Sequence, residues 1–180
     1  PCNFTAPPGR WPIPPPYTLG VILGDGSVGE GSVSWSKPDD EIAVEVGREL
    51  AWSQPHLQVS THVDTHVHGI VLCSPEHHQD TAARIFERVG LMGKRSWEKF
   101  IPQQYKVAPE PIRWAVVQGL LDTDGYADVR GHVSYSSASE TLATDMQYML
   151  RSLGFKATKT VKDEPAYRDT AGEKHVCRPS

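Results

Sequence analysis

The pattern of apolar and polar residues divides the chain, from Tyr17 onward, into short helices and strands. An apolar stretch over about 17–25 predicts a helix that ends at Gly26, where we expect a positive φ at the C-terminal cap. Serines alternate with apolar residues in SVSWSK (32–37), which is typical of a strand. The remaining elements predicted in this half are a helix capped by Asp39 or Asp40 with Ile42, Ala43, Val46 and Leu50 inward, strands over 57–63 and 68–73, and a helix over 81–89.

The same order of elements is predicted again in the second half of the chain. It begins with a helix over 111–124, continues with strands near 126–130 and 132–136, and then has a helix that begins at Ser139 and ends at Gly154. The inward residues of the last helix are Leu142, Met146, Met149, Leu150 and Leu153. A strand over 155–161 and another near His175 follow, after which, by comparison with the first half, we expect that a closing helix is missing and the domain continues.

Two segments with nearly the same sequence show why the halves resemble each other. GVILGDG (20–26) recurs as GLLDTDG (119–125), and VSWS (33–36) recurs as VSYS (133–136). Such a recurrence at a nearly constant offset indicates an internal repeat. We therefore predict an α+β domain of two αββαββα repeats with antiparallel sheets, the second truncated. The expected divisions are a proline-rich linker over 1–16 and a domain over 17–180, with one repeat over about 17–98 and the other over about 110–180.

Each recurring segment places an aspartate, Asp25 or Asp124, at the last position of a helix. A carboxylate there faces the negative end of the helix dipole, which is unfavourable by about 0.3–1 kcal/mol. A divalent cation would reverse the sign of this effect, because Mg²⁺ takes carboxylate and carbonyl oxygens as ligands. Gly20, Gly24 and Gly119 would let the two helices approach closely. Taken singly, each Asp-Gly pair is also an ordinary turn dipeptide; the repetition favours a joint acidic centre.

Composition restricts the class of protein. With 38% hydrophobic and 22% charged residues the chain is typical of a globular protein, and its net charge of −4 excludes a basic nucleic-acid tail. The charge is uneven: residues 1–80 hold three basic and ten acidic side chains, whereas residues 81–180 hold fifteen and twelve. Three cysteines without a CxxC pair argue against a disulfide framework or a thiolate zinc site. We expect a cytoplasmic protein with no membrane partner.

GVILGDG and GLLDTDG resemble the two copies of the LAGLIDADG (dodecapeptide, DOD-type) motif of homing endonucleases. GKRSWEKFIP (93–102) is similar to the Lys-x-Ile-Pro block found between those motifs in members carried by inteins, particularly inteins of bacterial replicative helicases. The resemblance covers the chain from about Tyr17 to its end. It implies that the two motif helices pack together, and that the chain is a divalent-metal-dependent DNA endonuclease, a phosphodiester hydrolase that cuts both strands of a long target to leave staggered ends.

The resemblance also implies roles for single residues. Asp25 and Asp124 would coordinate Mg²⁺ or Mn²⁺, together with main-chain oxygens of Gly24 and Thr123. Lys99 matches the lysine of the block beside one active site, and Lys174 is our choice for its partner, with Lys159 or Lys162 as alternatives. The first motif departs from the second in having Leu23 and Gly24 where the second has Asp122 and Thr123. The expected protein is a monomer with internal pseudo-twofold symmetry, flanked by intein splicing segments in its parent chain.

Double-stranded DNA is the expected partner, and polar residues on the strands are the candidates for contacting it. Alternating polar side chains suit base edges in the major groove, and lysines suit phosphates. Alternation also marks the solvent side of any half-buried sheet. The candidate DNA-binding residues are Ser32, Ser34, Ser36, Lys37, Gln58, Ser60, His62, Lys94, Arg130, His132, Ser134, Lys156 and Lys159.

Two other functions fit parts of the sequence. A non-cleaving LAGLIDADG nucleic-acid-binding module, of the maturase or regulator kind, would have the same fold but would tolerate loss of the aspartates. A zinc hydrolase is indicated weakly by the spacing of His62, His66 and His68, which matches no common zinc signature. The retained aspartates favour cleavage.

Overall fold

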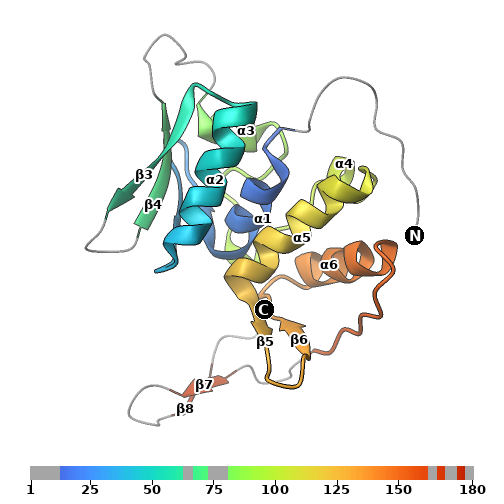
Figure 1. Ribbon diagram of the computed structural model, residues 1–180. Coiled ribbons are helices and arrows are strands. Elements are labelled where there is room, and N and C mark those ends of the chain that lie inside the picture. The colour runs from blue at the N-terminus through green and yellow to red at the C-terminus, as the bar shows by residue number, and fades with distance from the viewer. Residues whose placement is uncertain (1–12, 63–66, 73–80, 162–165, 169–173, 177–180) are drawn as a thin grey trace.

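The computed structural model describes residues 13–62, 67–72, 81–161, 166–168 and 174–176, and it shows an α+β protein with antiparallel sheets (Figure 1). The helices are α1 (Pro16–Asp25), α2 (Asp40–Ser53), α3 (Ala82–Glu87), the 3₁₀ helix η3 (Ser96–Glu98), α4 (Gln103–Lys106), α5 (Glu110–Asp124) and α6 (Glu140–Ser152). The strands are β1 (Gly26–Val28), β2 (Val33–Ser36), β3 (Leu57–His62), β4 (Val67–Leu72), β5 (Gly125–Ala127), β6 (Val133–Tyr135), β7 (Ala166–Arg168) and β8 (Lys174–Val176). The predicted fold class is confirmed.

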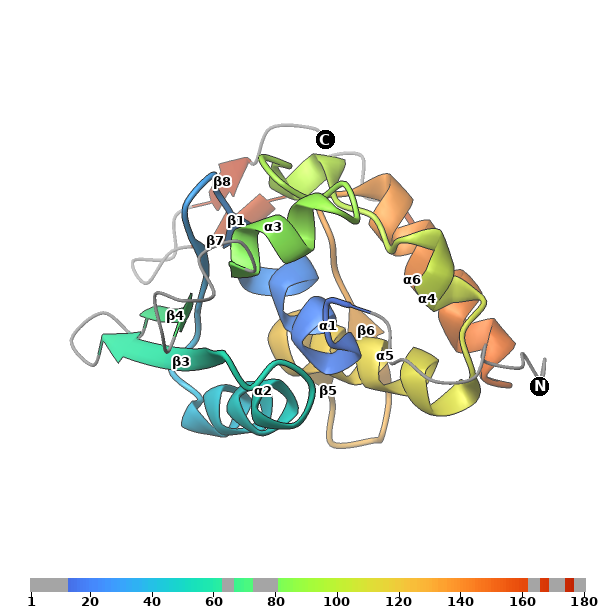
Figure 2. The same cartoon turned by 90° about the horizontal axis from the view of Figure 1, so that it is seen from above.

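Helices α1 and α5 lie side by side at the centre of the molecule (Figures 1 and 2). They approach closely because each has a glycine at the contact. A Cβ atom on Gly20 would lie 2.4 Å from the carbonyl oxygen of Val116, and one on Gly119 would lie 2.4 Å from that of Tyr17. Neither position has room for a side chain, so the small residues in the two motifs set the distance between the helices.

Strands β1 to β4 form one antiparallel sheet in the order β1-β2-β4-β3. The register aligns Val33, Ile70 and Val59 across three strands on the face that packs against the helices. Successive residues of a strand point to opposite faces, so the alternate positions Ser34, Gly69 and Ser60 share the other face. The alternation of polar and apolar residues in the sequence therefore predicts which face of this sheet packs against the helices.

The second half has the same order of elements up to α6, but the sheet is smaller. Strands β5 and β6 pair only with each other, and β7 and β8 form a separate pair, within the described parts of the chain. Ser139 caps α6, because its hydroxyl accepts a hydrogen bond from the backbone of Leu142 at 3.1 Å, and Gly154 ends the helix with φ +94°. Both of these local predictions are confirmed.

The strand predicted over 155–161 is wrong. The segment has no strand and lies against α6 instead. Gln147 and Arg151 both donate to the carbonyl oxygen of Ala157, and Lys159 donates to Glu140 and Thr144. The Phe155 ring stacks on Trp114 of α5 with centroids 5.4 Å apart. Hydrogen bonds to α6 and a ring contact with α5 therefore hold this segment outside any sheet, although its composition is compatible with a strand.

The role predicted for Gly26 is also wrong. Its φ is −88°, and that of the matching Gly125 is −84°, so neither residue is in the left-handed region. Space requires glycine at both positions, because a Cβ on Gly26 would lie 2.5 Å from the Cα atom of Ile22, and one on Gly125 would lie 2.3 Å from the carbonyl oxygen of Leu121. Each glycine lets the chain turn from the end of a helix directly into a strand.

No helix in the described part of the chain is long and apolar enough to cross a bilayer.

Candidate functional site

The last residues of α1 and α5, Asp25 and Asp124, come together where the two helices end. A Cβ atom on Gly24 would lie only 3.2 Å from Oδ2 of Asp124, so the second motif's carboxylate lies against the end of the first motif. Burial and then the charge of Asp25 raise the pKa of Asp124 to about 6, whereas Lys37 and Lys99 lower it. The two carboxylates therefore form one acidic centre.

Lys99 lies beside this centre, after η3, and only 7% of its surface is exposed. Its Nζ donates three hydrogen bonds to the main chain at the end of α1: to Ile22 at 2.9 Å, Gly24 at 3.1 Å and Gly26 at 2.7 Å. Burial lowers the pKa of the ammonium group, against the charges of Asp124 and Asp25, which raise it. A buried cation thus adds a donor to three main-chain carbonyl groups where α1 ends and β1 begins, one of which, that of Ile22, also accepts the backbone N–H of Gly26.

Lys37 lies at the same centre, although the sequence indicated only a phosphate contact for it. Its Nζ forms an ion pair with Oδ2 of Asp25 at 2.8 Å, and the two side chains are 26% and 33% exposed. The hairpin register explains the contact: β1 starts directly after Asp25, and Gly26 pairs with Trp35, so the chain just past Ser36 returns to the end of α1. The short length of this hairpin is the feature of the sequence that places Lys37 near Asp25.

The predicted metal ligands Gly24 and Thr123 lie next to the aspartates, with their functional groups in use. The Gly24 carbonyl accepts the bond from Lys99, and the Thr123 hydroxyl donates to the carbonyl oxygens of Gly119 and Leu120 in its own helix. A carbonyl oxygen has two lone pairs, so a ligand role for the main-chain oxygens of both Gly24 and Thr123 stays a prediction.

The polar residues predicted to face DNA in the first half gather on one side of the sheet. Ser34 and Ser60 flank Gly69 in one row, and Ser36 and His62 flank Val67 in the next. Gln58 is exposed on the same face, and Ser32 is exposed in the turn before β2. This face points away from α1 and α2 (Figure 2). The structure therefore brings these candidates together as one polar surface.

The candidates in the second half are more scattered. Ser134 lies exposed on β6, but Arg130 and His132, which the sequence placed on strands, lie in the turn between β5 and β6, where Asp128 bonds both backbones. Lys94 and Lys156 are exposed, whereas Lys159 is held by Glu140 at 3.1 Å. Lys174 belongs to β8, and its side chain lies outside the described part, as does Lys162.

The histidine spacing does not produce a zinc site in the described residues. His68 is buried, stacks on Trp35 with centroids 5.1 Å apart, and uses both ring nitrogens, with Thr61 and with the carbonyl oxygen of Lys37. His62 is exposed on the polar face, and His66 lies outside the described residues. No group of three histidine, cysteine, aspartate or glutamate side chains in the described chain could hold a metal ion.

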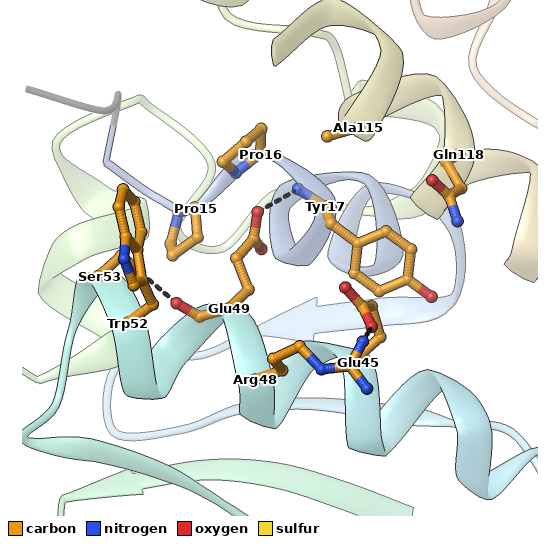
Figure 3. A pocket seen from close by; sticks show the side chains of 10 residues that line it. All are labelled: Pro15, Pro16, Tyr17, Glu45, Arg48, Glu49, Trp52, Ser53, Ala115 and Gln118. Atoms are coloured by element: carbon orange, nitrogen blue, oxygen red, sulfur yellow. Dashed lines mark hydrogen bonds and ion pairs between the residues drawn. The ribbon is translucent and has the colours of Figure 1, made fainter. Parts of the chain in front are cut away.

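A pocket lies at the other end of α1, between α1, α2 and α5 (Figure 3). Glu49 of α2 caps α1 there by accepting bonds from the backbones of Tyr17 and Thr18 at 2.9 and 2.7 Å. Burial raises the pKa of Glu49, although these hydrogen bonds lower it. The charge at this end of α1 is thus complementary to the helix dipole, in contrast to the aspartate at its other end.

Residues 112–178, which begin in α5 and contain the second motif, match the family model of the LAGLIDADG-like domain. This part of the chain is similar to LAGLIDADG-like domains. The chain is 29% identical over 155 residues to the replicative DNA helicase DnaB of Mycobacterium intracellulare, covering 86% of this chain and 22% of that protein. It is 27% identical over 164 residues to protein RecA of Mycobacterium bovis, covering 84% of this chain and 20% of that protein.

A third relative is the DNA polymerase of Thermococcus hydrothermalis, which is 34% identical over 84 residues, 47% of this chain and 5% of that protein. The chain therefore spans about a fifth or less of the length of these relatives. The similarity between this chain and each relative is limited to a short segment of a much longer protein.

Proposed function

We propose that the chain is a site-specific homing endonuclease domain that makes a metal-dependent, staggered double-strand break in a long DNA target. One observation carries the proposal: two helices end on Asp25 and Asp124 at a single place, beside two lysines and next to a polar sheet. Folding has gathered like charges at helix ends where the dipole disfavours them, and this arrangement is best explained by a cation and a phosphate that bind there.

The donor atoms at this centre fit Mg²⁺ or Mn²⁺. Asp25 and Asp124 supply carboxylate oxygens, and the main-chain oxygens of Gly24 and Thr123 are the further candidates. The raised pKa of Asp124 reflects burial and the charge of Asp25, both of which a bound cation would counter. When bound, the metal would supply Lewis acidity toward the scissile phosphate and a more acidic water.

The chain's own residues would bind and orient the DNA and stabilise charge. Lys99 fixes the end of α1, and thereby the position of Asp25, through its three hydrogen bonds. In this proposal Lys174 would be the counterpart of Lys99 in the second half. The polar face of β2 to β4 would lie in the major groove, with exposed lysines such as Lys94 and Lys156 on phosphates. The charge of the scissile phosphate would then be met by groups already in place.

We further propose that the domain belongs to an intein in a cytoplasmic parent protein. The support is that similar segments make up small parts of three differently named proteins: a replicative DNA helicase, a protein RecA and a DNA polymerase. An inserted element accounts for this distribution. The domain would act as a monomer with two pseudo-symmetric repeats, over about 17–98 and 110–180, preceded by the linker over 1–16.

A non-cleaving nucleic-acid-binding module is the second candidate. The fold and the polar sheet face serve it equally well, and only the acidic centre distinguishes the two functions. A chain that merely binds nucleic acid gains nothing from a pair of carboxylates with a raised pKa beside the phosphate backbone, because they repel it. The acidic centre therefore favours the endonuclease.

The proposal is tested by an experiment in which the chain selects its own DNA target from a library. A library of supercoiled plasmids with randomised inserts is incubated with the full chain and Mg²⁺, and the linear products are sequenced. We expect one long site to be enriched and to be cut with staggered ends. Asp25→Asn and Asp124→Asn should each lower its cleavage by about 10³-fold or more, because the metal ligands are lost.

The matched control is Glu41→Gln, which removes one exposed carboxylate from the first turn of α2. It should leave the cleavage rate within about 2-fold of wild type, since solvent screens an exposed charge and little of its effect remains. Retention of Mg²⁺-dependent cleavage by both aspartate variants would contradict the mechanism. DNA binding without cleavage by the wild-type chain would establish the second candidate.

A further inference from the structure

Lys37 has no counterpart in the second half of the molecule. The segment VSWSK (33–37) corresponds to VSYSS (133–137), so the residue that matches Lys37 is Ser137. The matching hairpins have matching registers, with Gly26 opposite Trp35 and Gly125 opposite Tyr135. The two hairpins therefore have the same strand register. They differ in the next side chain that matters, which is the ammonium group of Lys37 in the first half and the hydroxyl of Ser137 in the second.

The position of Lys37 is fixed by a buried group of residues. The ring of His68 stacks on Trp35 at an interplanar angle of 24°, and its Nε2 donates to the main-chain carbonyl of Lys37 at 3.0 Å. A carbonyl oxygen can only accept, so the proton lies on Nε2. The other nitrogen, Nδ1, forms a hydrogen bond with the hydroxyl of Thr61 at 3.0 Å. The backbone of Lys37 is thus tied to two neighbouring strands.

The second half has no such support in the described residues. Strand β6 pairs only with β5 there, so no strand takes the place of β4 beside it. Ser137 instead accepts a bond from the backbone of Ser139 at 3.1 Å, next to the start of α6. The difference between the halves thus includes both the side chain and the strand that would hold it.

We propose that Lys37, held by His68, is a further residue of the cleavage centre and makes its two halves unequal. This inference rests on the proposed endonuclease function. The Lys37 ammonium group contacts Asp25 at 2.8 Å and is a fixed cation on that side, where a phosphate oxygen gains negative charge during hydrolysis. The Asp124 side has no described cation in the matching position. One DNA strand is therefore cut with the help of Lys37, and the other is cut without it.

The test is strand-resolved cleavage of the duplex selected by the wild-type chain, with a different fluorophore on each strand. Wild type should cut the two strands at different rates. Lys37→Ser should slow one strand by about 10-fold or more and the other by less than about 3-fold, since loss of one charge-stabilising donor has this order of effect. The matched control is Arg48→Ser, which removes a cation from an exposed ion pair with Glu45 and should change neither rate.

His68 is a positioning residue, because it contacts Lys37 and not the carboxylates. His68→Asn should slow the same strand as Lys37→Ser, and the double variant should be no slower on that strand than Lys37→Ser alone. A purely structural role would slow both strands equally and would add to the effect of Lys37→Ser. Urea unfolding of each variant gives the separate effect on stability.

Binding of Mn²⁺ without DNA, followed by the EPR signal of the free ion, gives a readout independent of cleavage. Lys37 competes for Asp25, so Lys37→Ser should bind Mn²⁺ several-fold more tightly, whereas Arg48→Ser should match wild type. Equal slowing of both strands in Lys37→Ser, or unchanged Mn²⁺ binding, would overturn the inference and leave the proposed function standing. A wild-type chain that cuts no duplex would overturn both.

Discussion

The ends of α1 and α5 carry the same Asp-Gly pair and turn into the same kind of hairpin, yet their surroundings differ. At the end of α1, Lys37 pairs with the carboxylate of Asp25, and Lys99 bonds three carbonyl groups. At the end of α5, no lysine of the described chain donates to the terminal carbonyls, and the pKa of Asp124 is raised to about 6. Among the described residues, equal motifs thus have unequal surroundings, because Lys37 and Lys99 supply charge at the end of α1.

The sheets differ in the same direction. Four strands follow α1 and bury Val33 and Trp35, whereas the described hairpin after α5 leaves Tyr126 68% and Val133 63% exposed. The two halves share one hydrophobic core, to which the first half contributes α1, α2 and its sheet, and the second half chiefly α5 and α6. Four tests would sharpen this comparison, and they follow from the largest expected effect to the smallest.

Lys99→Met should be the most destabilising change. It removes a buried ammonium group and leaves the carbonyl groups of Ile22, Gly24 and Gly26 without that donor. We expect the free energy of unfolding in urea to fall by about 3 kcal/mol, since buried acceptors without partners cost about 1–3 kcal/mol each and removal of a buried charge offsets part of that. Lys94→Met, at an exposed site, is the control; an equal loss in both variants would contradict this role.

Gly119→Ala tests the contact that the two halves share. The added Cβ would lie 2.4 Å from the carbonyl oxygen of Tyr17 and would force α1 and α5 apart. A loss of about 2–3 kcal/mol in urea unfolding is expected, because overpacking against backbone cannot relax cheaply. Gly31→Ala is the control, since its Cβ would meet nothing within 4 Å. Similar stability of the two variants would mean that the helices are not in contact at Gly119.

The pH dependence of stability tests the inequality of the two carboxylates. The folded chain holds the Asp124 proton up to about pH 6, whereas an unfolded aspartate loses it near pH 4. The folded state binds more protons between these values, so this group's contribution to stability is present below about pH 4 and is lost as the pH rises through 6.

Asp124→Asn should remove this contribution. Across the window from about pH 4 to 6 the free energy of unfolding of wild type should fall by about 1 kcal/mol relative to the variant, after allowance for screening by solvent. Glu49 also has a raised pKa, and comparison with Asp124→Asn cancels its effect. Parallel stability curves for the two proteins would show that Asp124 is not perturbed.

The stack of Trp114 on Phe155 tests the path of the segment that follows α6. A double-mutant cycle with Trp114→Ala and Phe155→Ala should give a coupling free energy of about 0.5–1 kcal/mol, typical of an aromatic pair at the surface. Thermal or urea unfolding measures it. Additive effects of the two substitutions would mean that residues 155–161 do not follow α6 in solution.

Much of the fold follows from local sequence. The bounds of α1, α2, α5 and α6 and the strands of the first sheet agree with the apolar periodicity to within a few residues. Ser139 and Gly154 mark the two ends of α6 as expected. These predictions succeed because caps, helical periodicity and strand alternation depend on residues within a turn or two of each other.

The sequence alone thus determined the helices that end on Asp25 and Asp124, the hairpins that follow them and the polar face of the first sheet. Tertiary structure decided which groups meet there. Lys99 contacts residues 73 to 77 positions away, and His68 reaches Lys37 across 31 positions. No periodicity encodes such contacts, because they depend on the close packing of α1 on α5 and on strand register, which are set only when the whole domain folds.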